Sequence, residues 1–149
     1  MNDKRQLIPI IGLLVTTAIA TYMVVQISGQ GKPAPTGNFT NAAVAEVRDG
    51  QGRVVLQGQF LVNEEDGDDI ERKATLKSTV GSDAAGEAEV EFAKSAPATQ
   101  EIEFEVTGLQ AGATFTFVID GQEVATAAAD QRGTAEVEFD VKMPGTSAR

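Results

Sequence analysis

The sequence predicts one small all-β domain that a single N-terminal transmembrane helix holds outside the cytoplasm. Near the N-terminus, a run of 21 residues from Leu7 to Ile27 carries no charge. From about Asn41 onward, apolar residues alternate with polar ones, and Gly or Asp-Gly steps separate the alternating runs. A period of two is typical of half-buried strands. The predicted domain is a single β-sandwich or small barrel of about seven or eight short antiparallel strands.

The predicted transmembrane helix occupies residues 7–28. A helix rises about 1.5 Å per residue, so this run is long enough to cross a hydrocarbon core of roughly 30 Å. Lys4 and Arg5 precede the run, and the next charged residue is Lys32. By the positive-inside rule, residues 1–6 lie in the cytoplasm and the C-terminal domain lies in the periplasm or outside the cell. The predicted location is therefore the cell membrane, as a single-pass signal-anchor protein.

A cleaved signal peptide is the competing interpretation of the same segment. Ala18 and Ala20 form an A-x-A cleavage signal after a short apolar stretch. The apolar run continues to Ile27, beyond the usual end of a signal-peptide core, and this length favours a retained anchor.

Small residues follow one face of the predicted helix. Gly12, Thr16 and Ala20 lie four residues apart, a spacing that lets two membrane helices approach closely. They are the candidate helix-packing residues. They also raise the alternative that the protein is an accessory subunit of a membrane complex.

The remaining chain divides into three parts. Residues 29–40 are rich in Gly and Pro and predict a linker, residues 41–142 form the β domain, and residues 143–149 form a flexible tail. Asp120 and Gly121 predict a two-residue hairpin, and the Asp49 to Gly52 stretch predicts a second one. The predicted strands are 43–48, 53–62, 71–80, 87–93, 101–107, 113–119, 123–128 and 134–142.

A ten-residue pattern, D-x-x-G-x-A-E-V-E-F, occurs at residues 83–92 and again at 130–139, 47 positions later. Internal similarity at this spacing predicts two related β units within one domain. In each unit we expect a turn followed by a strand that directs Ala, Val and Phe inward.

The second unit, residues 101–140, contains three turn motifs in a fixed order. Gly-Leu-x-x-Gly at 108–112 follows a strand, a D-G turn follows the next strand, and D-x-x-G precedes the last one. This segment resembles a repeated β module of uncharacterised bacterial membrane-anchored envelope proteins. The resemblance implies a β fold and an exposed location, and it implies no activity.

The composition excludes several classes of function. Three of the 12 basic and one of the 22 acidic residues precede Gly37, which leaves 9 basic and 21 acidic residues after it and a balance of −12. A domain this acidic repels phosphate backbones, so no nucleic acid is expected as a partner. The chain has no Cys and no His, which removes disulfides, thiolate chemistry and the usual zinc and haem ligands.

Carboxylates occupy every second position of three predicted strands. They are Glu87, Glu89, Glu91, Glu101, Glu103, Glu105, Glu136, Glu138 and Asp140. Their alternation with apolar residues places them on solvent-facing sides. They form either a solvated outer face or a surface for a cationic partner. The candidate interaction face comprises Glu89, Glu91, Glu103, Glu105, Glu136 and Glu138.

The densest acidic run lies at residues 63–71 and supplies hard oxygen ligands of the kind that Ca²⁺ prefers. The candidate ligands are Glu64, Glu65, Asp66, Asp68 and Asp69. Their spacing does not fit an EF-hand, and an exposed polar loop is the alternative interpretation. No other cofactor is expected.

The sequence contains no P-loop, dinucleotide fingerprint, nucleophile elbow or metalloprotease motif. We therefore expect no catalytic or cofactor-binding residues and no enzyme activity. The predicted function is a non-enzymatic structural or protein-interaction module of the cell envelope. A Ca²⁺-binding envelope module and an accessory subunit of a membrane complex are the alternatives.

Overall fold

The computed structural model describes residues 37–66, 69–93 and 99–143. Nine strands lie in these ranges: β1 (Val44–Arg48), β2 (Val54–Gln59), β3 (Leu61–Asp66), β4 (Asp69–Ser78), β5 (Ala85–Ala93), β6 (Thr99–Thr107), β7 (Thr114–Ile119), β8 (Gln122–Ala128) and β9 (Ala135–Lys142). Within the same ranges, no helix is long and apolar enough to cross a membrane. The predicted transmembrane helix, with Gly12, Thr16 and Ala20, lies outside the described residues, as do residues 144–149 of the predicted tail.

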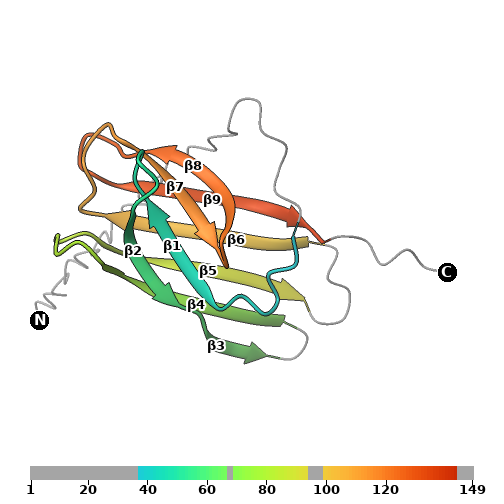
Figure 1. Cartoon of the computed structure of the whole chain (residues 1–149). Helices are drawn as coiled ribbons and strands as arrows, with labels where there is room; N and C mark the ends of the chain where they lie inside the picture. Colours follow the sequence, from blue (N-terminus) through green and yellow to red (C-terminus); the bar gives the residue numbers. More distant parts are fainter. Residues whose placement is uncertain (1–36, 67–68, 94–98, 144–149) are drawn as a thin grey trace, which may run out of the picture.

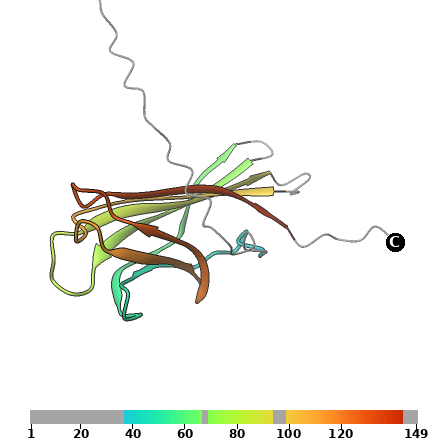
Figure 2. The same cartoon turned by 90° about the horizontal axis from the view of Figure 1, so that it is seen from above.

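All the strands belong to one antiparallel sheet (Figure 1). Its order is β8-β7-β1-β2-β4-β5-β6-β9, and β3 pairs with β4 off this path. The sheet curls so that β1, β2, β7 and β8 lie over β4, β5, β6 and β9 (Figure 2). Its two ends, β8 and β9, lie close together, so the sheet is nearly closed. The all-β prediction is confirmed, with nine strands instead of seven or eight, and the continuous sheet is barrel-like.

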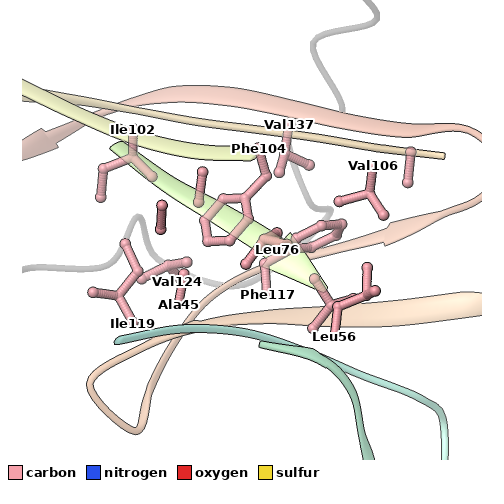
Figure 3. Close-up of a cluster of buried hydrophobic side chains, with 14 of the residues drawn as sticks. Ala45, Leu56, Leu76, Ile102, Phe104, Val106, Phe117, Ile119, Val124 and Val137 are labelled. Carbon is pink, nitrogen blue, oxygen red and sulfur yellow. The ribbon is translucent and has the colours of Figure 1, made fainter. Parts of the chain in front are cut away.

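Apolar side chains from both layers meet between them. The labelled residues in Figure 3 are Ala45, Leu56, Leu76, Ile102, Phe104, Val106, Phe117, Ile119, Val124 and Val137, and all of them are buried. Phe104 of β6 and Phe117 of β7 face each other across the core with ring centroids 5.1 Å apart and planes at 62°. This edge-to-face contact joins the two layers at the centre of the domain.

The predicted strand 53–62 is wrong as a single element, because it is divided into β2 and β3 at Phe60. Both strands pair with β4, so the chain bends without leaving its neighbour. A Cβ atom at Gly58 would lie 2.4 Å from the backbone oxygen of Thr75, so this approach of two strands requires glycine. Phe60 is buried after the bend.

The D-x-x-G pattern forms the same turn at residues 49–53 and 130–134. In both, the aspartate N–H donates to the carbonyl oxygen four residues later, at 2.9 Å from Asp49 and 2.8 Å from Asp130. In both, aspartate Oδ1 accepts two further backbone N–H groups. The fourth residue is Gly52 or Gly133, with φ of 78° or 79°, where glycine is favoured. The predicted hairpin after Asp49 is confirmed.

The predicted equivalence of residues 83–92 and 130–139 holds for the strands and fails for the turns. Val90 and Phe92 in β5 are buried, as Val137 is in β9, so the inward pattern is confirmed. Gly86, however, lies inside β5. The preceding connection depends on Ser78, whose Oγ accepts the N–H of Ser82 at 2.9 Å. The structural partner of the turn at 130–134 is therefore 49–53.

Two of the motifs that carry the family resemblance pack against each other. The N–H of Leu109 in Gly-Leu-x-x-Gly donates to the carbonyl oxygen of Gly133 in D-x-x-G, at 2.9 Å. A Cβ atom at Gly133 would lie 2.3 Å from the oxygen of Leu109. The D-G turn lies elsewhere, at Asp120 and Gly121, and closes the β7–β8 hairpin as predicted. The Gly-Leu-x-x-Gly and D-x-x-G motifs therefore meet in one contact between two loops.

Residues 37–43, which we call the strap, belong to the fold and not to the linker predicted at 29–40. Gln100 is the one polar side chain among the described residues that is fully buried. Its Oε1 accepts the N–H of Phe39 at 2.6 Å, and its Nε2 donates to the carbonyl oxygen of Gly37 at 2.9 Å. Phe39 itself is buried in the core. The linker prediction is too long because buried contacts far along the chain hold this segment.

Candidate acidic interaction face

Nine carboxylates lie on the outer side of β5, β6 and β9, and we call this surface the acidic face. β6 lies between β5 and β9 and pairs with both. The members are Glu87, Glu89 and Glu91 of β5, Glu101, Glu103 and Glu105 of β6, and Glu136, Glu138 and Asp140 of β9. All nine residues are exposed or half-buried. The structure thus brings together all six residues of the predicted interaction face and three further carboxylates.

The carboxylates are in register across the three strands. One row contains Glu91, Glu101 and Asp140. The middle row contains Glu89, Glu103 and Glu138, and the third row contains Glu87, Glu105 and Glu136. Directly opposed residues on a sheet have Cβ atoms about 5 Å apart. The face is therefore a three-by-three array of like charges, which the sequence could not predict because it does not reveal that β9 pairs with β6.

Two glutamates of β6, the middle strand of the array, have raised pKa values. Partial burial, together with the charges of Glu138 and Glu91, raises the pKa of Glu101. Partial burial also raises the pKa of Glu103, and the charges of Glu89 and Glu138 add to the effect. Each of these carboxylates is thus less acidic than it would be alone in water.

A cationic side chain of β4, Lys73, borders the acidic face. Lys73 lies opposite Glu89, and its Nζ is 3.1 Å from Glu89 Oε2 and 3.6 Å from Glu71 Oε1. The hydrogen bond to Glu89 raises the pKa of Lys73. Lys73 is not among the residues of the predicted interaction face, although its position two residues from Glu71 on an alternating strand places both on one side of β4.

An open depression lies at one end of the acidic face. Its volume is about 330 Å³, and Ala85, Gly86, Glu87, Glu105 and Thr107 line it. A Cβ atom at Gly86 would lie 2.3 Å from the backbone oxygen of Glu105, so glycine here lets β5 and β6 approach closely. The depression lies at the end of the row that Glu87 and Glu105 share.

Four of the five predicted Ca²⁺ ligands lie in paired strands and not in a free loop. The backbones of Glu64, Glu65 and Asp66 belong to β3, where Asp66 pairs with Asp69 of β4. Asp68 lies outside the described residues. Among the residues whose side chains are described, no three acidic groups converge in a way that could hold a metal ion. The calcium hypothesis stays a prediction, and a calorimetric titration of the full-length protein with millimolar Ca²⁺ is its test.

The acidic face can bind a cationic surface through charge-assisted hydrogen bonds. Comparison of the chain with models of protein families, with characterised proteins and with solved structures finds no match.

Proposed function

We propose that the protein is a single-pass membrane protein whose β domain binds a cationic protein partner in the periplasm or outside the cell. The acidic face is the contact surface, and the protein catalyses no reaction. The observation that carries the proposal is the register of nine carboxylates across β5, β6 and β9. The uncharged run from Leu7 to Ile27, preceded by Lys4 and Arg5, supports the anchor and its orientation.

The arrangement is unfavourable for the isolated domain. Six pairs of carboxylates oppose each other directly on neighbouring strands. Each such pair costs on the order of 0.2–1 kcal/mol. A mixture of positive and negative surface charges would keep the domain soluble without this repulsion. A partner with Lys or Arg side chains would remove the repulsion on binding, which is the reason to assign the face to recognition.

The test is the binding of octalysine to the full-length protein in detergent micelles at low and at physiological salt. In the test variant, glutamine replaces the middle row: Glu89→Gln, Glu103→Gln and Glu138→Gln. A matched control variant removes the same number of negative charges from other exposed positions, as Asp69→Asn, Asp83→Asn and Glu123→Gln. We expect the affinity of the test variant to fall at least about tenfold, while the control stays within about threefold of the parent.

Equal losses in both variants would mean that net charge and not the acidic face attracts the peptide, and would refute the contact surface. Mass spectrometry of the membrane-extracted protein tests the anchor separately. An intact N-terminus agrees with the proposal. A chain that begins near Thr21 in the exported soluble fraction contradicts it.

A further inference from the structure

The strand β3 offers one open edge. Its backbone pairs with β4 on one side. On the other side, the pairing of β1 with β2 ends at Val44 and Gln59, and one further hydrogen bond, from the N–H of Phe60 to the carbonyl oxygen of Ala43, precedes β3. No strand in the described part of the chain covers the outer edge of β3. Edge strands of this kind present unpaired N–H and C=O groups that can accept a further strand.

Apolar side chains flank this open edge. Leu61 is 69% exposed and Val62 is 50% exposed. Successive side chains on a strand point to opposite faces, so the two residues lie above and below the edge. A strand added at the edge would cover both side chains through cross-strand pairs. Val80, the third exposed large apolar residue among those that the structure describes, lies away from β3 in the connection after β4.

The charge of β3 selects the kind of strand that can be added. The sequence LVNEED contains three acidic residues and no basic one. A second copy of β3 would place like charges across the new ladder, which is unfavourable. A strand with Lys or Arg at one end and apolar residues at the other would place its cations beside the acidic end of β3 and its apolar side chains beside Leu61 and Val62. Charge complementarity therefore favours a cationic extended segment over self-association.

We propose that the outer edge of β3 binds an extended segment of a partner protein, rich in Lys or Arg and apolar residues, as an added strand. This edge is separate from the acidic face, because β4 lies between β3 and β5. The proposal therefore does not require the function assigned to the acidic face.

The test uses the full-length protein in detergent micelles and the synthetic peptide Lys-Lys-Lys-Thr-Val-Val-Thr, which as an antiparallel strand places Lys beside the acidic end of β3 and Val beside Leu61 and Val62. A second peptide has the same sequence and charge and is N-methylated at its three central residues, so that neither of its edges can donate a full set of backbone hydrogen bonds. Binding is measured by calorimetry, and hydrogen exchange reports protection of the amides of residues 61–66. The variant Leu61→Ser with Val62→Ser removes the apolar flanks without changing the charge, and Val80→Ser is the matched control.

We expect the unmodified peptide to slow exchange at residues 61–66 and the methylated peptide not to do so. The double variant should weaken binding about tenfold or more, since covering two apolar side chains is worth over 1.4 kcal/mol. Val80→Ser should bind as the parent does. Equal binding of the two peptides, unchanged binding by the double variant, protection only on other strands, or no binding would each overturn the proposal. Protection of β3 in a dimer without peptide would also overturn it, because a second copy would then be the occupant.

Discussion

The strands β5, β6 and β9 carry nine carboxylates on their outer side, whereas β1, β2, β7 and β8 contain two glutamates and one arginine in all. Two of the three charged residues in the second group, Glu46 and Arg48, form an ion pair. Glu46 accepts hydrogen bonds from the guanidinium of Arg48 and from Nε2 of Gln57. Both groups of strands direct apolar residues into the same core.

We call β5, β6 and β9 the acidic half of the sheet, and β1, β2, β7 and β8 the other half. Comparing them shows which residues the fold needs and which it does not. The core needs apolar residues at inward positions in both halves, and both supply them. Nothing in the fold requires the outward positions of one half to be acidic, because the other half of the same sheet has threonine, alanine and glutamine there. The acidic face is therefore a property that folding does not explain, and experiments that treat the halves differently can test this distinction.

The largest effect is expected at Gln100, which joins the two halves. It belongs to β6 of the acidic half and holds the strap that leads into β1 of the other half. Gln100→Ala leaves the Phe39 N–H without its partner and opens a cavity in a buried site. We expect the free energy of unfolding to fall by roughly 2–3 kcal/mol, measured by urea denaturation. Gln110→Ala at an exposed position is the control and should change it by less than about 0.5 kcal/mol.

If Gln100→Ala cost no more than Gln110→Ala, the hydrogen bonds between Gln100 and the strap would not contribute to stability. The two halves would then be joined by the sheet and core alone.

Replacing a single glutamate should change the free energy of unfolding by a smaller amount. The change should be a gain in the acidic half and a loss in the other half. Glu103 faces Glu89 on one side and Glu138 on the other, so Glu103→Gln relieves two repulsions. We expect a gain of roughly 0.5–1 kcal/mol at pH 7 in low salt, and less in high salt. Glu46→Gln removes the pair with Arg48 and should lose about 0.2–0.5 kcal/mol. Urea denaturation of both variants in parallel gives the comparison, and a loss of stability in Glu103→Gln would contradict the view that the acidic face strains the domain.

Much of the fold could be predicted from the sequence because its signals are local. Alternation places Val90 and Phe92 inward, and Asp-Gly at 120–121 sets the β7–β8 hairpin. What could not be predicted depends on contacts between distant segments. Gly58 is needed because β2 approaches β4 closely, and the N–H of Phe39 is held by a side chain 61 positions away. Neither leaves a periodic trace in the sequence.

The candidate site shows the same limit. Alternation was sufficient to predict that the carboxylates share the solvent side of their strands. It could not predict that β9 lies beside β6, which doubles the number of opposed carboxylate pairs. The ten-residue repeat was misleading in a related way, because identical letters at Asp83 and Asp130 occupy different structures. The side chain of Asp130 accepts the N–H groups of Arg132 and Thr134 in a turn. No such turn follows Asp83, because Gly86 lies inside β5.

The smallest expected effect is a change of stability with pH that belongs to the acidic half. The pKa values of Glu101 and Glu103 are raised in the folded protein above the value of 4.5 for a free side chain. Between 4.5 and the raised pKa, the folded state binds more protons than the unfolded state, so acidification stabilises it. The melting temperature should therefore rise by a few degrees as the pH falls from 7 toward 4.5.

Further acidification should reverse this rise. The pKa values of Asp49 and Asp130 are lowered, chiefly by hydrogen bonds from the backbone N–H groups of their turns. Their contribution is present above 3.8 and is lost as the pH falls through their lowered values. The variant Glu101→Gln with Glu103→Gln should lose most of the rise between pH 7 and 4.5 and keep the decline below it. If the variant kept the full rise, Glu101 and Glu103 would not be its source, and the repulsion within the acidic face would not explain the response to pH.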